Sequence, residues 1–216
     1  GVEGISFHLK EGEIACLLGP SGCGKTSVLR AIAGFEPLMQ GSIVLHGKNV
    51  SSAEFSLPPE KRHIGMVFQD FALFPHLTVI ENVSFKLKDN AKAEHWIELL
   101  GLTPWRDVKP ANLSGGQKQR VALARPLAHE PAFVLLDEPL SNLDAALKDD
   151  LRWEIRQALK EAGVPAIWVT HDQEEALSVG DRIGILKDGK LQQIDTPENC
   201  FSKPQSRFVA RFLGDA

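Results

Sequence analysis

Short apolar runs that end in turn residues recur along the chain and predict buried strands. Four of them read EIACLLGP (Glu13–Pro20), IGMVF (Ile64–Phe68), FVLLD (Phe133–Asp137) and AIWVT (Ala166–Thr170). Each has the length of a strand and is much shorter than the roughly 20 apolar residues of a membrane span. We therefore expect these runs to form the central strands of a sheet.

Two other stretches predict hairpins. SIVLHGKNV (Ser42–Val50) would turn around Gly47, and RIGILKDGKLQQI (Arg182–Ile194) would turn at the Asp188–Gly189 pair. Asp-Gly is favoured in two-residue hairpin turns because both positions adopt a positive φ there. We expect antiparallel pairing at both places.

Helical patterns lie between these strands. From Asp144 to Ala162 apolar residues recur every four positions, so they share one face of a helix that Gly163 would end. These apolar residues are Leu147, Leu151, Ile155 and Leu159. A helix is also expected to run through Ala33, and AEHWIELLGL predicts a helix that stops at Gly101.

Strands that alternate with helices predict an α/β sandwich with a largely parallel sheet. Residues 71–128 depart from this alternation and carry helical patterns, so we expect a helical insertion there. The length of 216 residues suits one domain.

Composition narrows the class of protein. The chain has 24 basic and 28 acidic residues, a formal net charge of −4, which argues against a general nucleic-acid binder. The three cysteines show no paired spacing, so we expect reduced thiols.

The stretch GPSGCGKT matches the phosphate-binding loop pattern with no mismatch. Its glycines let backbone N–H groups converge on phosphate oxygens, and the following helix adds the positive end of its dipole. Lys25 would reach the β- and γ-phosphates, and Thr26 would ligate Mg²⁺. The residues expected to bind nucleotide here are Gly19, Pro20, Ser21, Gly22, Cys23, Gly24, Lys25, Thr26 and Ser27.

A second motif, FVLLDEP, places two carboxylates after a buried strand. Ligands of open α/β sheets bind outside the carboxyl ends of the strands, so both side chains are well placed for chemistry. Asp137 would hold Mg²⁺ through its water shell, and Glu138 would polarise the attacking water.

A third motif, LSGGQ (Leu113–Gln117), looks like a second anion-binding helix start. Ser114 lies 114 − 25 = 89 positions after Lys25, and one nucleotide cannot easily contact two helix starts in different lobes of one subunit. We expect a head-to-tail dimer in which this motif caps the γ-phosphate bound by the other copy. The contacting residues would be Ser114, Gly115, Gly116 and Gln117.

The alternative interpretation of LSGGQ is an ordinary helix start. Ser114 is a good N-cap, and Gln117 stands at the position that completes a capping box. Capping by itself would leave two consecutive glycines unexplained, since each costs about 1 kcal/mol within a helix.

In their order and spacing these motifs resemble the nucleotide-binding subunit of an ABC transporter, over nearly the whole chain. Gln69 in VFQD is similar to the family's glutamine that links Mg²⁺ to the helical subdomain. SNLD (Ser141–Asp144) is similar to its dimer-communication loop, and Asp144 also suits a helix N-cap. His171 in VTHD is similar to its γ-phosphate switch histidine.

The resemblance implies a P-loop NTPase (RecA-like) sandwich with an antiparallel β subdomain and an inserted helical subdomain. It implies one ABC ATP-binding domain over 1–216, with the catalytic core at 1–70 and 129–216 and the helical subdomain at 71–128. Family members usually begin with a strand whose aromatic residue stacks on adenine, and many continue into a C-terminal regulatory domain. We expect both parts to be absent here through truncation. Pro126 stands where the family usually has Ala, so we expect the signature helix to kink or end early.

The function implied is ATP hydrolysis, with ATP and Mg²⁺ as cofactors, that energises solute import. FALFPHLTV (Phe71–Val79) and its surroundings resemble importers of ferric iron, polyamines, maltose or sulfate, and ferric-iron importers look most similar. The implied partners are a second copy, integral membrane permease subunits and, indirectly, a periplasmic or extracellular solute-binding protein, with no nucleic acid. The implied location is peripheral, on the cytoplasmic face of the inner membrane.

The apolar segment DFALFPH (Asp70–His76) leaves two alternatives open, because it is either buried under the helical lobe or offered to the permease.

Two other functions compete with import. A non-transport ABC-type ATPase of DNA repair or chromosome organisation would place a long coiled coil between the two anion-binding motifs, and a separation of 89 positions leaves no room for one. A nucleotide-sensing regulatory subunit would not need Glu138 and His171.

Overall fold

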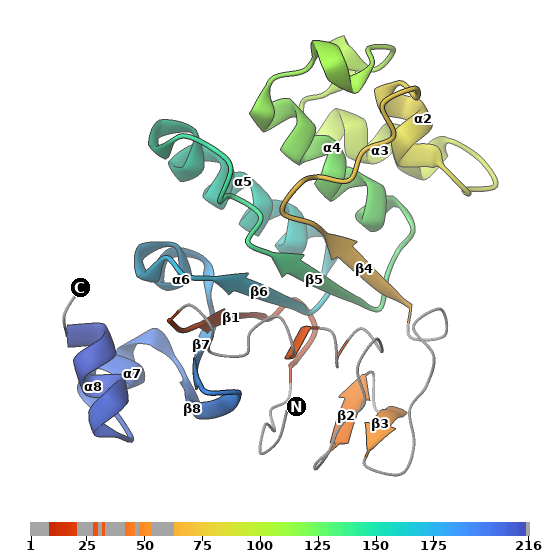
Figure 1. Cartoon of the computed structure of the whole chain (residues 1–216). Coiled ribbons are helices and arrows are strands. Elements are labelled where there is room, and N and C mark those ends of the chain that lie inside the picture. Colours follow the sequence, from red (N-terminus) through yellow and green to blue (C-terminus); the bar gives the residue numbers. More distant parts are fainter. Residues whose placement is uncertain are drawn as a thin grey trace.

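The computed structural model describes residues 9–20, 28–29, 32, 42–45, 48–52 and 63–214 (Figure 1). Within these residues the main sheet contains six strands, in the order β4-β5-β6-β1-β7-β8. From β4 to β7 in this order neighbouring strands are parallel, and β8 pairs antiparallel with β7. The strands are β1 (Ile14–Leu18), β4 (Ile64–Val67), β5 (Phe133–Asp137), β6 (Ala166–Thr170), β7 (Arg182–Lys187) and β8 (Lys190–Asp195). The predicted α/β architecture with a largely parallel sheet is confirmed.

Both predicted hairpins are present. β2 (Ser42–Leu45) and β3 (Lys48–Ser52) pair antiparallel and form a separate two-stranded sheet. In the turn between β7 and β8, Asp188 and Gly189 have φ angles of 51° and 77°, so both adopt the left-handed conformation that such a turn requires.

One group of helices lies together next to β4, at one edge of the main sheet, and the other helices lie along the rest of the sheet (Figure 1). The helices are α2 (Val79–Ser84), α3 (Ala91–Leu99), α4 (Gly115–Ala128), α5 (Ala145–Ala162), α6 (Gln173–Val179), α7 (Pro197–Ser202) and α8 (Arg207–Gly214), with the 3-10 turns η2 (Thr103–Trp105) and η3 (Pro110–Asn112). As predicted, α5 ends at Gly163, whose φ of 67° is left-handed. No helix of the described residues is long and apolar enough to cross a membrane.

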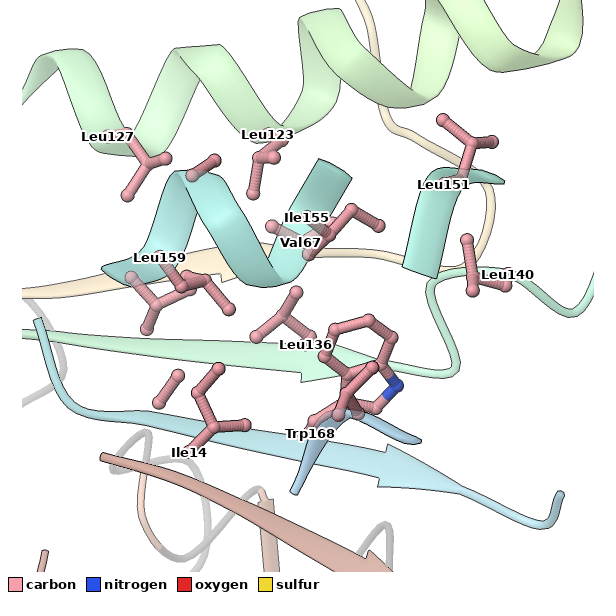
Figure 2. Close-up of a cluster of buried hydrophobic side chains, with 14 of the residues drawn as sticks. Ile14, Val67, Leu123, Leu127, Leu136, Leu140, Leu151, Ile155, Leu159 and Trp168 are labelled. Atoms are coloured by element: carbon pink, nitrogen blue, oxygen red, sulfur yellow. The ribbon is translucent and has the colours of Figure 1, made fainter. Parts of the chain in front are cut away.

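Side chains of the central strands alternate between two apolar clusters, one on each face of the sheet. On β5, Val134 and Leu136 belong to the first cluster, and Phe133 and Leu135 belong to the second. Figure 2 shows the first cluster, where α4 and α5 meet the strands. The second cluster takes in the helical residues Val28, Leu29 and Ile32. Because both faces are covered, the strands are apolar throughout, which is why they read as continuous runs in the sequence.

Helices α2, α3 and α4 pack against one another, as expected for a helical insertion. They are not isolated from the sheet, because α4 also contacts β4 and α5. The first apolar cluster accordingly contains side chains from α2 to α4 together with side chains from β1, β5 and β6. The limits of the helical subdomain at residues 71 and 128 stay a prediction.

The expectation that α4 ends early at Pro126 is wrong, because the helix continues to Ala128. Pro126 lies in the last turn and is buried beside β4. A side chain at Gly65 of β4 would bring its Cβ within 2.8 Å of the Cβ of Pro126. The absence of a side chain at Gly65 therefore makes room for the proline ring.

Two of the three cysteines lie in the described part of the chain, and both are buried free thiols. Burial raises the pKa of Cys16 well above its ordinary value and that of Cys200 to about 11. Both thiols therefore stay protonated near neutral pH, which makes them poor nucleophiles.

Candidate active site

Four neighbouring parallel strands carry candidate residues at their carboxyl ends. Gly19 follows β1, Gln69 follows β4, Asp137 ends β5, and His171 follows β6. Because these strands are parallel and adjacent in the sheet, all four ends lie on one edge, and the arrowheads of β4, β5 and β6 point to the same side in Figure 1. Ligand sites of open α/β sheets form at this edge.

Glu138 is held in a strained position at this edge. Its φ of 44° is left-handed, a conformation that costs a non-glycine residue about 1–3 kcal/mol. Its N–H donates to the carbonyl of Val169 on β6 at 2.9 Å, and its own carbonyl accepts from the hydroxyl of Ser141 at 3.1 Å. These bonds fix the backbone so that the carboxylate reaches the neighbouring strand end.

There the Oε1 atom of Glu138 lies 3.3 Å from Nδ1 of His171. The Glu138 side chain is 24% exposed and that of His171 is 63% exposed, so the pair opens to solvent. The two residues are 171 − 138 = 33 positions apart in the chain, and the parallel pairing of β5 with β6 brings them together.

The SNLD segment joins this pair to Gln69. The side-chain amide of Asn142 donates to the backbone carbonyl of Gln69 at 3.1 Å. The sequence placed Asn142 inside a motif but assigned it no contact, since no local pattern links positions 73 apart. Asp144 caps α5 by accepting from the N–H of Leu147 at 3.0 Å, so the structural half of its expected role is confirmed.

Ser114 and Gln117 form the complete capping box of α4. The hydroxyl of Ser114 accepts from the N–H of Gln117 at 3.2 Å, and Oε1 of Gln117 accepts from the N–H of Ser114 at 2.8 Å. The structural interpretation of these two residues is therefore correct. Their contact with a nucleotide on a second copy stays a prediction.

The two glycines of LSGGQ also pack closely against leucine side chains of the same chain. A Cβ at Gly115 would lie 3.0 Å from Cδ2 of Leu143, and a Cβ at Gly116 would lie 3.3 Å from Cδ1 of Leu147. Both positions belong to the first turn of α4, where a helix tolerates glycine better than in its interior. Capping still leaves the glycines unexplained, but close packing against the start of α5 is a second reason for small residues here, besides the expected contact with phosphate.

The phosphate-binding loop falls mostly outside the described residues, which include Gly19 and Pro20 but not Ser21, Gly22, Cys23, Gly24, Lys25, Thr26 or Ser27. Its surroundings are present. Buried β1 leads into Gly19, and the helical residues Val28 and Leu29 follow the loop. The strand-before and helix-after context that the motif requires is met.

The donor atoms at the edge suit a hard cation. The carboxylate of Asp137 and the side-chain amide oxygen of Gln69 follow adjacent strands, and oxygen ligands of this kind are those that Mg²⁺ prefers. No group of three or more His, Cys, Asp or Glu side chains with metal-site geometry occurs among the described residues. The proposed donor set of Thr26, Gln69 and Asp137 has one carboxylate, so it fits a cation that keeps several of its waters.

Comparison with known proteins accounts for this arrangement. The sequence profile of the family described as "ABC transporter" matches residues 2–141, more than half of the chain. The chain belongs to the ABC transporter family. The resemblance inferred from the motifs is confirmed.

Two curated ABC transporter relatives illustrate the similarity. The chain is 45% identical over 221 residues to the Fe(3+) ions import ATP-binding protein FbpC of Fusobacterium nucleatum, covering 99% of the chain and 58% of that protein. It is 46% identical over 219 residues to the spermidine/putrescine import ATP-binding protein PotA of Bacillus cereus, covering 98% of the chain and 66% of that protein. The chain thus spans about three-fifths of the length of these relatives.

Two solved ABC structures have the same fold. The structure of cbiO1 from Clostridium perfringens, part of the ABC transporter complex cbiONQ, superposes with a TM-score of 0.83 at 27% identity, over 94% of this chain and 85% of that one. The ATP-binding cassette MJ0796, a dimer in a post-hydrolysis state bound to ADP and Pi, superposes with a TM-score of 0.73 at 32% identity, over 90% of each chain. The predicted P-loop NTPase fold class is confirmed.

In this ABC transporter chain a buried hydrogen bond involves β6, the strand that precedes His171. Nε1 of Trp168 on β6 donates to Oε1 of Glu175 on α6 at 2.6 Å, and both side chains are buried. The bond ties α6 to the strand whose end carries His171. Burial raises the pKa of Glu175, which the hydrogen bond from Trp168 only partly offsets.

We expect Glu175 to make stability depend on pH. Its pKa is higher in the folded than in the unfolded chain, so the native state binds more protons and stability falls as pH rises from the ordinary glutamate value through the raised one. Glu175→Gln keeps an acceptor for Trp168 and removes the charge. The melting temperature of the variant minus that of the parent should therefore increase between pH 4.5 and pH 8. A difference that stays constant, or that shrinks, would contradict the raised pKa.

Proposed function

We propose that this chain is the ATP-binding and ATP-hydrolysing subunit of an importer that drives solute uptake through separate membrane subunits. The observation that carries the proposal is the single sheet edge at which the phosphate-loop strand, Gln69, Asp137, Glu138 and His171 meet. The sequence similarity to import ATP-binding proteins supports it.

Each candidate residue at this edge has a chemical role in the proposed hydrolysis. The loop Gly19–Thr26 and Ser27 hold the phosphates, with Lys25 on the β- and γ-phosphates. Glu138 orients a water and accepts its proton as the water oxygen bonds to the γ-phosphorus and the bond to the ADP oxygen breaks. His171, 3.3 Å from Glu138, contacts the γ-phosphate from the β6 side. Mg²⁺ bound by Thr26, Gln69 and Asp137 would neutralise charge on the phosphates.

The site is completed by a second copy in a head-to-tail dimer. Ser114, Gly115, Gly116 and Gln117 stand at the N-terminus of α4, where the helix dipole and the N–H groups of Gly115 and Gly116, which the capping box does not use, favour an anion. Asp144 lies at the start of α5 beside them. The dimeric state of the related cassette bound to ADP and Pi supports this arrangement.

The proposed solute is ferric iron, with spermidine or putrescine as the solutes to compare. The named iron and polyamine relatives are similar to the chain to the same degree, 45% and 46% identical, and both import cations. Permease subunits in the membrane and a solute-binding protein would complete the transporter, with the chain on the cytoplasmic face of the membrane.

We expect the chain to hydrolyse ATP only with Mg²⁺ and Glu138→Gln to block that hydrolysis. Loss of a general base costs about 10²–10⁴ in rate, while the amide keeps the shape of the side chain. Because ATP then persists in the shared site, sedimentation of Glu138→Gln with Mg-ATP should reveal dimers. A variant that binds ATP and stays monomeric at high concentration would refute the shared site, and Mg-independent hydrolysis in the parent would refute the metal.

The cap and the proposed nucleotide contact of Ser114 can be separated by substitution. Ser114→Asp keeps an N-cap oxygen but brings a negative charge towards the γ-phosphate of the other copy. We expect its melting temperature to stay within about 2 °C of the parent, which corresponds to a change of less than about 1 kcal/mol, and its hydrolysis to be lost.

Ser114→Thr, the matched control, keeps both hydroxyl and cap and should remain active. Mixing Ser114→Asp with Lys25→Ala protein should restore part of the activity, because one of the two sites in a mixed dimer is then intact. Mixtures no more active than either variant would exclude a site shared between copies.

We propose that the permease docks on an aromatic patch next to Gln69, formed by Phe68, Phe74, His76 and Phe85. Phe68 and Phe85 are 41% and 42% exposed. The ring centroids of Phe74 and Phe85 lie 4.8 Å apart. Phe68 also lines a cavity of about 810 Å³ between β4 and the end of α4. Exposed aromatic side chains beside a hollow are typical of protein–protein contacts. No residue of the segment Asp70–His76 is fully buried, so the buried alternative does not describe it, and docking remains the proposal.

We expect Phe85→Ser to prevent assembly with the permease while leaving hydrolysis by the separate chain within about twofold, since an exposed substitution changes stability by about 0.5 kcal/mol or less. Co-purification with the membrane subunits measures assembly. Phe201→Ser on α7 is the control, because Phe201 is 46% exposed and α7 lies far from α2 in Figure 1. Assembly retained by Phe85→Ser, or lost equally by Phe201→Ser, would contradict docking at the patch.

A further inference from the structure

The backbone just after Gln69 adopts an unfavourable conformation. Phe71 and Ala72 have φ angles of 67° and 51°, so two consecutive non-glycine residues are left-handed. Side chains other than glycine, asparagine and aspartate rarely adopt this conformation. Ala72 is exposed and Phe71 only partly buried, so burial of their own side chains does not explain it.

A single side chain from α4 contacts both strained residues. Nη1 of Arg125 donates to the carbonyl of Ala72 at 2.9 Å, and Nη2 lies 3.5 Å from the carbonyl of Phe71. The guanidinium carbon also lies 5.4 Å from the ring centroid of Phe74. The planar fork of arginine can reach two carbonyls and an aromatic face at once, which lysine cannot do.

Arg125 has no competing ion-pair partner in the described chain. The ion pairs of the structure include Arg120 with Glu154 and Arg182 with Glu13, but none with Arg125. Its guanidinium is thus directed at backbone carbonyls rather than at a carboxylate. A charged donor forms a stronger hydrogen bond than a neutral one, and this favours the strained turn.

The ends of the segment are fixed by other elements. Asn142 donates to the carbonyl of Gln69 at 3.1 Å, and Nδ2 of Asn82 on α2 donates to the carbonyl of Phe74 at 3.1 Å. Oδ1 of Asn82 accepts from the N–H of Phe74 at 2.9 Å. Arg125 therefore ties the backbone in the middle of the segment to α4, while the side chain of Leu73 packs against the first apolar cluster.

Helix α4 carries Ser114 and Arg125 at its two ends. They are 125 − 114 = 11 positions apart, which is roughly 16 Å along the axis at 1.5 Å per residue. If α4 moves as a rigid body, a displacement at the Ser114 end would also move the guanidinium that contacts the two carbonyls.

We propose that Arg125 is a positioning residue that holds the strained turn at Phe71–Ala72 and so couples α4 to the segment that carries Gln69 and Phe74. The coupling part of the inference rests on the proposed function, because it assigns the Ser114 end to nucleotide and the Phe74 end to the permease. The mechanical part rests on the hydrogen bonds and φ angles alone.

Hydrogen exchange of the nucleotide-free chain tests the mechanical part. Arg125→Lys keeps the charge but loses the fork, so exchange at the amides of residues 71–74 should rise about tenfold or more as the turn opens locally. Arg120→Lys is the matched control, because it makes the same change on the same helix at the ion pair with Glu154. Unchanged exchange in Arg125→Lys, or an equal rise in Arg120→Lys, would overturn the inference.

A double-mutant cycle adds a readout that general destabilisation would not move. Ala72→Gly relieves the left-handed strain only while Arg125 enforces it, so it should raise the melting temperature relative to its effect in the Arg125→Lys background. Additive effects of the two substitutions would show that Arg125 does not maintain the strain.

The coupling part is tested in the Glu138→Gln background. Adding Mg-ATP should change exchange at residues 71–74, and this change should be lost when Arg125→Lys is combined with Glu138→Gln. An equal ATP-induced change with either residue at position 125 would overturn the coupling. Failure of Glu138→Gln to bind ATP would count against the proposed function instead, while the nucleotide-free comparison still decides whether Arg125 holds the turn.

Discussion

Backbone hydrogen bonds between four parallel strands, β4, β5, β6 and β1, determine where the candidate residues lie. Each strand presents alternate side chains to two apolar clusters, so a shift of one residue in register would turn every buried side chain to the wrong face. Since the register is fixed in this way, the residue after each strand is fixed too. The pairing of Glu138 with His171 and the position of Gln69 both follow from it.

Several candidate residues also stabilise the fold of the single chain. Ser114 and Gln117 cap α4, Asp144 caps α5, and the two glycines of LSGGQ allow α4 to approach Leu143 and Leu147. Capping residues suit a functional role as well, because a helix start presents more N–H groups than its cap pairs. The same local geometry can therefore serve folding and anion binding, and only substitutions that preserve the cap separate the two.

Three non-glycine residues with a left-handed backbone lie close to the candidate edge. Glu138, Phe71 and Ala72 are left-handed non-glycine residues, each at a cost of about 1–3 kcal/mol. The burial of a single large apolar side chain in the core contributes about 1.5–3 kcal/mol, so the two clusters can offset this cost. Each strained residue is held by a specific hydrogen bond, from Arg125 to the turn and between Glu138 and Val169 on β6.

The sequence by itself determined the central strands, the two hairpins, the long helix α5 and the main motifs. The apolar runs predicted β1, β4, β5 and β6 to within a residue or two at their ends, and Asp-Gly predicted the last hairpin. These features depend on neighbours within a few positions, such as alternation, capping and glycine at a positive φ, and a linear pattern records them. The phosphate-binding motif and LSGGQ are likewise defined by residues within a few positions of one another.

Only the tertiary structure decided contacts between distant positions. The sequence suggested that Pro126 would kink α4 or end it early, but Gly65 on β4 leaves space for the ring and the helix does not end before Ala128. For the glycines of LSGGQ it indicated only a contact with phosphate, whereas the structure also places them against Leu143 and Leu147, where a side chain would be crowded. Nor could it join Asn142 to Gln69 or Arg125 to Ala72. Such contacts depend on which strand lies beside which and on how α4 packs, and no local residue pattern contains that information.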